Sequence, residues 1–511
     1  MKKIRIILAI IVCKLLIMAG KLAGKKGSST PGGIALKISP DVLKYLSKQV
    51  RREVIMVCGT NGKTTTNNLL YSLLKTQSDG VVCNNVGANM LPGVACAFID
   101  KASVFGRLNA DFAAIECDEA SLRHIIKHVT PDKIVITNLF RDQLDRYGEI
   151  DITIRLLNEA LEKLTDTTLI LNADDPLCAQ FGEGRKCLYY GVSENVNLTG
   201  NETKEGRFCL KCGNELTYSY YLYSQLGDYR CEKCGFCRPT PDYSASEVDL
   251  ADGIAFTLDF GGKKMRFAVD YRGFYNIYNL LASFAAFDSV GGRTENAEKV
   301  FKNYKPQIGR MEPFKIKGKT VVLNLSKNPA GFNQAIATLC SDPKKKDVII
   351  VLNDNAQDGR DVSWIWDVDY EKLAGANIAS LTASGIRKYD MALRLKYAGF
   401  DNVKTADNTR EVLLKTSQGE GEICYVLINY TALFDTQNNL RLWRTNKMEI
   451  NIAHLYPDLL NLYGDRGNII TLKRRCELRG ITANIHEYEL ADGIDFANTD
   501  IIFIGGGSDR E

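Results

Sequence analysis

At 511 residues the chain is too long for a single hydrophobic core, and roughly three or four domains are expected. Hydrophobic residues at 45% and charged residues at 25% exclude a disordered or fibrous protein. The formal net charge of +4 gives no argument for nucleic-acid binding, and no local basic face supplies one, so we expect no nucleic-acid partner. The 15 cysteines are scattered, and four are paired at metal-ligand spacing, which favours the reducing cytoplasm over a secreted disulfide framework.

The chain begins with a cationic and apolar segment. Lys2, Lys3 and Arg5 precede the apolar run 6–12, as in a signal peptide, but Lys14 interrupts the run and no clear small-residue cleavage site follows. No uninterrupted stretch approaches the about 20 apolar residues of a membrane-spanning helix. We therefore expect a helix that lies on the protein or on the inner membrane surface of a cytoplasmic protein, with a cleaved signal or a single anchor as alternatives.

The next part of the chain is typical of an α/β fold. Breaker-rich residues 27–33 predict a linker, which ends an N-terminal unit of residues 1–39. In residues 40–308 short apolar runs alternate with helix-length stretches, which predicts a doubly wound, mainly parallel sheet. The expected elements are strands at 54–57, 112–115, 134–136 and 169–171, a helix at 64–74, and paired strands within 255–270.

Two further regions extend this organisation. A Cys- and Tyr-rich insertion at 205–240 interrupts the alternation of the central domain. From residue 309 the alternation resumes, and it predicts a second α/β domain over 309–447. Its expected strands are 320–323, 347–352 and 422–427.

A glycine-rich loop, Gly59-Thr60-Asn61-Gly62-Lys63-Thr64, joins the first expected strand of the central domain to its first helix. Backbone N–H groups of such a loop bind phosphate oxygens, the lysine neutralises the charge of the β- and γ-phosphates, and the threonine hydroxyl reaches the metal ion. Only two residues separate the glycines, whereas the common P-loop has four. The setting between strand and helix nevertheless predicts binding of ATP with Mg²⁺.

The insertion contains a second chemical motif, Cys209-x-x-Cys212 and Cys231-x-x-Cys234, with 18 residues between the pairs. This spacing lets two knuckle turns place four thiolates around zinc. Because all four positions are cysteine and none is left for water, we expect a structural zinc ribbon rather than a catalytic or redox site. Cys237 is expected to be a buried small residue, with a ligand role as the alternative.

The segment GTNGKTT at 59–65 resembles the loop of Mur ligases and folylpolyglutamate synthases, and companion motifs follow in that family's order. The companions are Glu116 in IECDEAS, Thr137-Asn138 with 141–148, the NADDP loop at 172–176, YNIYN at 275–279 and IGRME at 308–312. Singly, these motifs could be an Asx-type turn, a helix cap or a solvated acidic face. In their common order they favour the Mur-type reading.

This resemblance implies a set of site residues. The implied ATP-binding residues are Gly59, Thr60, Asn61, Gly62, Lys63, Thr64, Thr65, Asn138, Asn276, Asn279 and Arg310, and the implied magnesium ligands are Thr64 and Glu116. Two departures leave metal coordination and acid/base details open. Gln143 stands where murein ligases usually carry a histidine, and Asn324-Leu-Ser-Lys-Asn-Pro329 replaces their DYAHNP element.

The Mur-type loop, the ribbon and the run LNDNAQDGRDVSWIWD at 352–367 together resemble the MurT family, the ligase subunits of lipid II isoglutaminyl synthase, over residues 1–447. That family amidates the α-carboxyl of D-glutamate in the lipid II stem peptide through an acyl phosphate, with ammonia from a GatD-type glutaminase. The resemblance implies that Lys63 and Glu116 are catalytic, and that Asp361 orients the histidine of the partner's Cys-His pair. Asp358 is the second choice for this role, and a turn with a helix cap is the alternative for both.

Residues 448–511 are similar to the start of the GatD glutaminase, a class I amidotransferase, up to the glycine-rich loop at 505–507. Because no nucleophilic cysteine elbow follows, we expect a partial glutaminase that is poorly packed, from a fused chain or from read-through into a neighbouring frame. A small accessory βαβ unit is the alternative. A Mur-type or folylpolyglutamate-type amino-acid ligase would leave the ribbon and this segment unexplained, and a zinc-ribbon nucleic-acid-binding ATPase is the rival from another class.

Overall fold

The computed structural model describes residues 2–22, 29–84, 88–141, 150–196, 206–251, 253–305, 309–316, 318–355, 357–416, 419–444, 449–460, 465–478, 481–490, 492–494 and 498–506. The chain forms two compact units, which are described separately. One unit comprises Met1–Pro313 with Val321–Leu433, and the other comprises Phe314–Thr320 with Phe434–Glu511.

The first unit contains a nine-stranded sheet with the order β11-β10-β9-β6-β5-β4-β1-β3-β2. Neighbouring strands are parallel from β2 to β9, whereas β9, β10 and β11 pair antiparallel. The prediction of a mainly parallel, doubly wound sheet is confirmed. The strands are β1 Val50–Cys58, β2 Val81–Cys83, β3 Ala110–Glu116, β4 Lys133–Ile136, β5 Thr168–Asn172, β6 Cys187–Val192, β9 Tyr243–Asp249, β10 Ile254–Phe260 and β11 Lys263–Val269.

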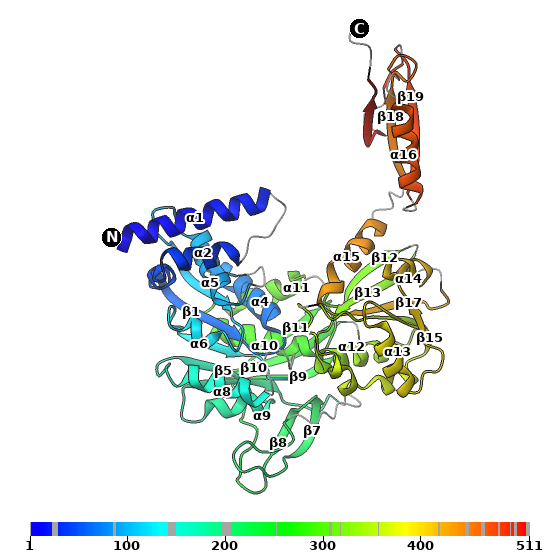
Figure 1. The fold of residues 1–511 in the computed structure, drawn as a ribbon. Coiled ribbons are helices and arrows are strands. Elements are labelled where there is room, and N and C mark those ends of the chain that lie inside the picture. Colours follow the sequence, from blue (N-terminus) through cyan, green and yellow to red (C-terminus); the bar gives the residue numbers. More distant parts are fainter. Residues whose placement is uncertain are drawn as a thin grey trace. The chain divides into compact units, whose positions relative to one another are not determined.

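Helices cover both faces of this sheet, so it separates two hydrophobic cores (Figure 1). Along β1, Val54 and Met56 enter one core, while Ile55 and Val57 enter the other. A strand buried on both faces explains why the sequence shows continuous apolar runs instead of alternation. The first core takes side chains from α1 Lys2–Leu22, α2 Thr30–Ile38, α3 Val42–Ser47, α5 Leu91–Lys101, α6 Leu122–Ile125 and α8 Ile150–Leu161, and the second from α4 Lys63–Lys75, α10 Tyr275–Asp288 and α11 Ala297–Asn303.

The prediction of a linker at 27–33 is wrong for its second half. Helix α2 begins at Thr30, so the proline and the two glycines that follow it, expected to break structure, lie inside a helix. Pro31 suits a first helical turn, where its missing N–H costs nothing. A Cβ on Gly32 would lie 1.9 Å from the carbonyl oxygen of Pro92 at the start of α5, so only glycine permits this close helix crossing. Residues 27 and 28 lie outside the described part of the chain.

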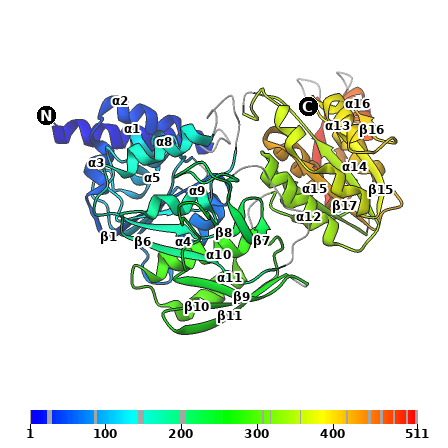
Figure 2. The same ribbon diagram turned by 90° about the horizontal axis from the view of Figure 1, so that it is seen from below.

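The N-terminal helix α1 is formed as predicted and packs on α2 and α5. Figure 2 shows α1, α2, α3, α5 and α8 gathered together, away from α10 and α11. Among the described helices, none is both long enough and apolar enough to span a membrane.

The second predicted α/β domain contains a six-stranded sheet with the order β12-β13-β17-β14-β15-β16. Its central pairs, β17 with β14 and β14 with β15, are parallel. The strands are β12 Glu312–Ile316, β13 Lys319–Leu325, β14 Lys346–Val351, β15 Ile378–Ser384, β16 Lys404–Ala406 and β17 Ile423–Ile428. The helices are α12 Pro329–Ser341, α13 Lys388–Tyr397, α14 Thr409–Thr416 and α15 Tyr430–Arg444, with short 3-10 turns at Ser363–Asp367 and Tyr370–Gly375.

The C-terminal segment forms a small parallel sheet with the order β19-β18-β20. Among its described residues, Ile452, Ile469 and Ala483 form the buried apolar cluster. Large apolar side chains remain exposed at Ile470, Leu478, Leu490, Ile501, Ile502 and Ile504, as a thinly covered sheet predicts. The elements are β18 Glu449–Leu455, α16 Asp465–Glu477, β19 Thr482–Tyr488 and β20 Ile501–Ile504.

Candidate active site and four-cysteine cluster

The phosphate loop joins β1 to α4, as the sequence predicts. Gly59 and Gly62 have φ angles of 119° and 84°, which glycine adopts without strain. A Cβ on Gly59 would lie 2.3 Å from Thr137 Oγ1, and a Cβ on Gly62 would lie 2.2 Å from Asn279 Oδ1. Both glycines are therefore required by backbone conformation and by the close approach of neighbouring side chains.

Lys63, the first residue of α4, is buried and turned toward its own loop. Its Nζ donates to the carbonyl oxygens of Gly59 and Thr60, and forms an ion pair of 3.0 Å with Glu119 Oε1. Burial raises the pKa of Glu119, while the Lys63 charge lowers it. This arrangement holds the ammonium group under the loop where phosphate oxygens would bind. The sequence motifs gave no role to Glu119, although it lies three residues after Glu116 in the segment IECDEAS.

A second segment, Thr137-Asn138 after β4, holds the loop in place. Asn138 Oδ1 accepts from the Asn61 N–H at 2.8 Å, and Asn138 Nδ2 donates to the Asn61 carbonyl oxygen at 3.0 Å. Thr137 Oγ1 donates to the same Asn61 carbonyl at 2.7 Å. Asn138 thus has a visible role in fixing the loop conformation, in addition to lining the pocket.

Glu116 is the last residue of β3, beside β1 in the sheet. Asn84 fixes its backbone through two hydrogen bonds of 2.8 Å, and Asn89 Nδ2 donates to Glu116 Oε1 at 3.3 Å. The other carboxylate oxygen, Oε2, is buried and has no hydrogen-bond partner among the described residues. A buried, incompletely paired carboxylate oxygen fits a divalent cation, since Mg²⁺ prefers such ligands. Thr64, the other predicted ligand, is partly exposed at the start of α4.

A pocket opens above the loop and is lined by residues from the central domain and from the start of the second α/β domain. Of the predicted nucleotide-binding residues, six line this pocket: Asn61, Gly62, Thr65, Asn138, Asn279 and Arg310. Asn276 contributes indirectly, because its Oδ1 accepts a hydrogen bond of 2.9 Å from Nδ2 of the pocket residue Asn279.

The segment that replaces the DYAHNP element forms the opposite wall of the pocket. Asn328 caps helix α12 by accepting from the Gly331 N–H at 2.9 Å, and its Nδ2 donates to Asn61 Oδ1 at 3.2 Å. The two domains thus meet at the phosphate loop. The NADDP and IGRME motifs lie on described residues except Ile308, whereas residues 142–148, including Gln143, lie outside them.

The polar side chains of the NADDP motif are buried and form a hydrogen-bond network. Asp174 Oδ1 pairs with Arg238 Nε at 2.6 Å, and its Oδ2 accepts from Tyr278 OH at 2.7 Å. Asp175 caps helix α9 (Pro176–Ala179) through the Leu177 N–H, and burial raises its pKa to about 6. The Asx-type turn considered from the sequence is present, since Asn172 Oδ1 accepts from the Asp174 N–H. The hydrogen bond from Tyr278 to Asp174 also connects the end of β5 to α10.

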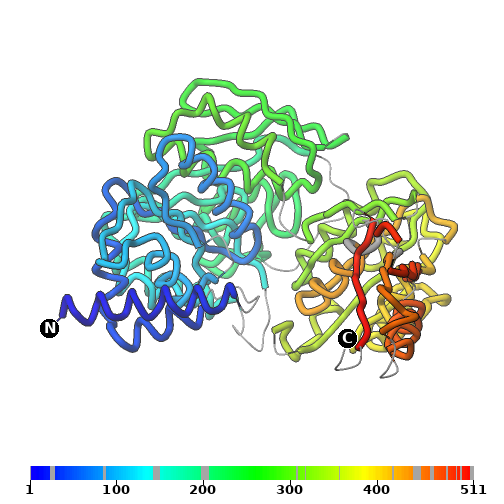
Figure 3. Tube along the Cα trace, turned by 90° about the horizontal axis from the view of Figure 1, so that it is seen from above, coloured from blue at the N-terminus to red at the C-terminus, as the bar shows by residue number. Residues whose placement is uncertain are grey.

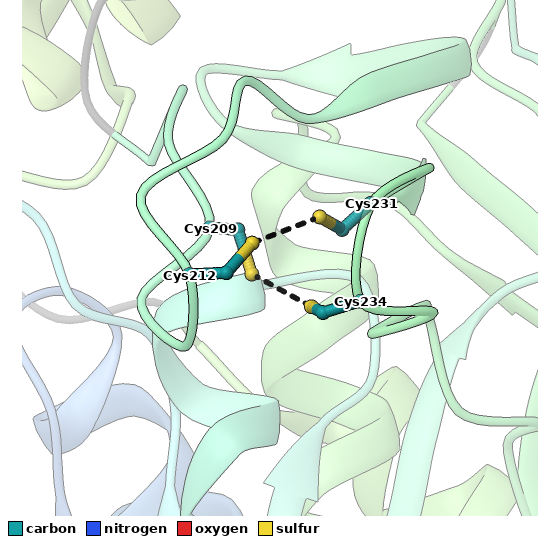
Figure 4. A group of neighbouring side chains, drawn as sticks. All are labelled: Cys209, Cys212, Cys231 and Cys234. Atoms are coloured by element: carbon teal, nitrogen blue, oxygen red, sulfur yellow. Dashed lines mark hydrogen bonds between the residues drawn. The ribbon is translucent and has the colours of Figure 1, made fainter.

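The four cysteines of the ribbon come together as predicted (Figure 4). Their Sγ atoms all lie within 4.8 Å of one another, with separations of 3.5 Å for Cys209–Cys234 and for Cys212–Cys231. About 2.3 Å Zn–S bonds in a tetrahedron require Sγ separations of roughly 3.8 Å, so the cluster has the size of a zinc site. The backbone N–H of Cys234 lowers the pKa of the Cys231 thiol to about 6, whereas burial and the neighbouring thiols raise the pKa of Cys209 and of Cys212.

Each cysteine pair forms a turn that closes on a glycine. The Gly213 N–H donates to the Cys209 carbonyl at 2.8 Å, and the Gly235 N–H donates to the Cys231 carbonyl at 2.9 Å. Cys237 is exposed, so the expectation that it is buried is wrong. Its backbone pairs with Arg230 to close the second turn, which leaves its side chain in solvent.

The ribbon's hairpin, β7 Thr217–Tyr223 and β8 Leu226–Arg230, connects the cysteine cluster to the nucleotide pocket. Tyr223 at its tip lines the pocket and packs against Phe140, in the segment that follows β4. Gln225 Nε2 donates to the Leu139 carbonyl at 2.7 Å and to Asp175 Oδ1 at 3.4 Å. Sequence reasoning missed both residues, because the spacing of the cysteines predicts a metal site but not where the hairpin tip lies.

The two acidic candidates in the 352–367 run have different environments. Asp358 is buried and accepts from the backbone N–H and the hydroxyl of Thr431 at the start of α15. Asp361 is partly exposed, and its Oδ1 accepts from the Ser363 N–H at 2.8 Å, which lowers the pKa of its carboxyl. Asp361 therefore forms an Asx-type turn just before the 3-10 turn at Ser363–Asp367, whose N-cap is Val362. Asp358 is committed to α15, and Asp361 is the more accessible of the two carboxylates.

Two family models match the chain: the Mur ligase middle domain over residues 57–211, and the MurT ligase C-terminal domain over residues 325–433. Over 63 residues, 12% of the chain, it is 52% identical to the GatD subunit of the lipid II isoglutaminyl synthase (glutamine-hydrolyzing) of Staphylococcus aureus (strain N315), of which the match covers 26%.

Among solved structures, a pseudomurein peptide ligase type C from Methanothermus fervidus has a similar fold, with a TM-score of 0.63 at 23% identity. The match covers 79% of this chain and 80% of that one. The MurT subunit of the synthase from the same Staphylococcus aureus strain is 38% identical over 392 residues, which cover 76% of this chain and 87% of that subunit. Identity at this level over most of a MurT subunit shows that the chain belongs to the MurT family of Mur-type ligases.

Proposed function

We propose that the chain is the ligase subunit of a lipid II isoglutaminyl synthase, which uses ATP to amidate the α-carboxyl of D-glutamate in the lipid II stem peptide. The similarity to MurT subunits carries this proposal, and the pocket geometry supports it. A Mur-type phosphate loop lies opposite a wall, Asn324–Asn328, that differs from the DYAHNP element of the amino-acid-adding ligases.

The chemistry assigns roles to the residues of the loop. A carboxylate is a poor acyl donor, and phosphorylation by ATP converts it to an acyl phosphate with a good leaving group. The loop N–H groups and the Lys63 ammonium bind the phosphates and stabilise the charge of the transferring phosphoryl group. Glu116 and Thr64 would hold Mg²⁺, which would neutralise further phosphate charge. Thr60, Asn61 and Asn138 keep the loop in the conformation that presents its N–H groups.

The second substrate is ammonia. Free ammonia is mostly protonated at neutral pH, so delivery from an adjacent glutaminase avoids a large loss of nucleophile. Family membership and the GatD-like stretch at the C-terminus support a GatD-type glutaminase as this source. In this scheme Asp361 orients the histidine of the glutaminase Cys-His pair, a triad divided between two subunits.

The four-cysteine cluster is proposed to hold structural Zn²⁺. All four ligand positions are thiolates, which leaves no open position for a reacting water. The hairpin between the two cysteine pairs reaches the nucleotide pocket, so the metal would stabilise one wall of the active site. We further propose that the protein works in the cytoplasm, at the inner membrane surface where a lipid-linked substrate is accessible.

Product analysis tests the function. The chain is incubated with a separate GatD-type glutaminase, lipid II, ATP and Mg²⁺, with either glutamine or ammonium as the nitrogen source. Mass spectrometry should show conversion of one carboxyl group to an amide with both sources. A mass gain of a whole amino acid would instead establish an amino-acid ligase. ATP turnover that requires nucleic acid and leaves lipid II unchanged would support the nucleic-acid-binding alternative.

A further inference from the structure

Helix α1 has two apolar faces, of which the protein covers only one. The residues of the first face are buried in the core of the central domain: Ile6, Ala9, Ile10, Cys13 and Ile17. The second face is a continuous stripe at helical spacing, exposed by between 39% and 85%: Ile4, Leu8, Ile11, Leu15, Met18 and Leu22. Figure 3 shows α1, in blue, running along the outer margin of the N-terminal part of the chain. A second apolar stripe on a helix that is already packed indicates a further contact surface.

A neighbouring loop extends this surface. Gly106 lies against α1, since a Cβ on it would be 3.3 Å from Ile10 Cδ1. The two residues before it, Val104 and Phe105, are exposed by 46% and 77%. Gly106 therefore meets the covered face of α1, and the loop before it adds two exposed large apolar side chains next to the helix.

The charges around the stripe identify the kind of surface it fits. Helix α1 contains five cationic side chains and no acidic residue: Lys2, Lys3, Arg5, Lys14 and Lys21. Arg5 and Lys14 donate to the carbonyl oxygens of Ile38 and Asp100, whereas Lys2, Lys3 and Lys21 are exposed. The exposed cations Lys101 and Arg107 flank the Val104–Phe105 loop. Cations around an aliphatic and aromatic stripe, on a helix too polar to span the bilayer, are typical of helices that lie in the headgroup region of anionic membranes.

We propose that the exposed stripe of α1, together with Val104 and Phe105, docks the protein on a bilayer that contains anionic lipid. The helix axis lies parallel to the membrane plane, with the apolar stripe in the acyl boundary and the exposed lysines, Lys2, Lys3 and Lys21, at the phosphate groups. This surface deepens the proposed function by naming what holds the enzyme near a lipid-linked substrate. Binding to vesicles that lack lipid II depends only on the surface, so it can be measured separately from amidation.

The test is flotation of the full chain with vesicles of phosphatidylcholine alone or with added phosphatidylglycerol. The wild-type chain should float with the anionic vesicles, and flotation should fall with added salt. The Leu8→Ser/Leu15→Ser variant and the Phe105→Ser variant should bind at least about tenfold more weakly, because each removes apolar area from the acyl boundary. Leu393→Ser in α13 is the matched control, since Leu393 is 50% exposed and Leu8 is 51% exposed. Unchanged thermal unfolding of each variant establishes that the fold is kept.

The proposal is overturned if the wild-type chain stays with the unbound fraction on anionic vesicles, or if the double serine variant floats as well as wild type. The stripe could instead join two copies of the chain. Sedimentation velocity would then show a wild-type dimer and a monomeric double serine variant, and neither would bind vesicles. This outcome would also overturn the proposal. With a soluble short-chain lipid II analogue the stripe variants should keep the wild-type amidation rate. If the wild-type chain did not amidate the analogue, that result would contradict the proposed function but not the docking surface.

Discussion

The phosphate loop and the Asp361 segment are both marked by sequence motifs, but their surroundings differ. Lys63 and Glu116 are buried: Asn138, after β4, holds the loop, Asn89 donates to Glu116, and Thr66 of α4 donates to Asn279 of α10. Asp361 is partly exposed, and its described hydrogen bond is a local one to Ser363. A buried and internally fixed site can perform chemistry within its own chain. A partly exposed carboxylate with a local hydrogen bond fits the proposed role of completing a site on a partner.

The strongest test of this difference is Lys63→Ala. Removal of the ammonium group should abolish ATP turnover, by at least about 10³-fold, and should do so with glutamine and with ammonium alike, because both routes need the acyl phosphate. The measurement is phosphate release together with lipid II amidation. Lys75→Ala is the control, since Lys75 ends the same helix and pairs only at the surface with Asp79. Equal losses in both variants would show that damage to α4, and not the lost charge, is responsible.

The second test is Asp361→Asn, which can keep the hydrogen bond from the Ser363 N–H through its amide oxygen. If Asp361 completes the partner's triad, the glutamine-dependent rate should fall by about 10²-fold or more, while the ammonium-supported rate should stay within about twofold of wild type. Glutamate release and lipid II amidation are measured side by side. Asp407→Asn is the control, because Asp407 is an exposed carboxylate paired with Lys388 in the same domain. A parallel fall with both nitrogen sources would remove the distinction between the two regions.

The third test asks whether the ribbon supports the buried site. Cys231→Ser should lower the free energy of unfolding by several kcal/mol, because a structural metal site contributes directly to folding. Zinc analysis and thermal unfolding are the measurements, and a chelator should produce a similar loss in wild type. Cys237→Ser tests the specificity, since Cys237 lies in the same ribbon but outside the cluster and exposed. If both substitutions had the same small effect, the cluster would not hold a stabilising metal.

The parts that the sequence predicts well are those in which neighbouring residues determine the structure. The loop from Gly59 to Thr64 could be predicted because a strand, a glycine turn and a helix follow one another directly. The cysteine cluster could be predicted because two short turns bring each pair together. The mainly parallel sheet follows from its doubly buried strands, although β2, with three residues, is too short to give a recognisable pattern.

The parts that the sequence could not predict depend on contacts between distant residues. The ion pair of Lys63 with Glu119 joins positions 56 residues apart, and the contact of Gln225 with Leu139 joins positions 86 apart. The two glycines of α2 suggest a linker, and only the close crossing with α5 explains why they are helical. In each case the missing information is which surfaces meet in the folded chain.

The smallest effect is expected for Gln225→Leu, which tests whether the hairpin tip preorganises the nucleotide pocket. The variant leaves the Leu139 carbonyl without this donor and removes a donor from Asp175, which should lower the free energy of unfolding by about 1–3 kcal/mol. The pH dependence identifies the Asp175 contribution. Its folded pKa of about 6 lies above the unfolded value of about 3.9, so stability from the neutral carboxyl is present at low pH and is lost as pH rises through 6.

Loss of the Gln225 donor should raise the folded pKa of Asp175 further, so the difference in unfolding free energy between variant and wild type should increase from pH 5 to about pH 7. Denaturant unfolding across this pH range measures that difference. The variant should also bind nucleotide more weakly in titration calorimetry at pH 7, because Leu139 directly follows Asn138, which holds the loop. A constant difference across the pH range would show that Gln225 acts on Leu139 alone. Unchanged affinity would show that the pocket keeps its shape without the hairpin tip.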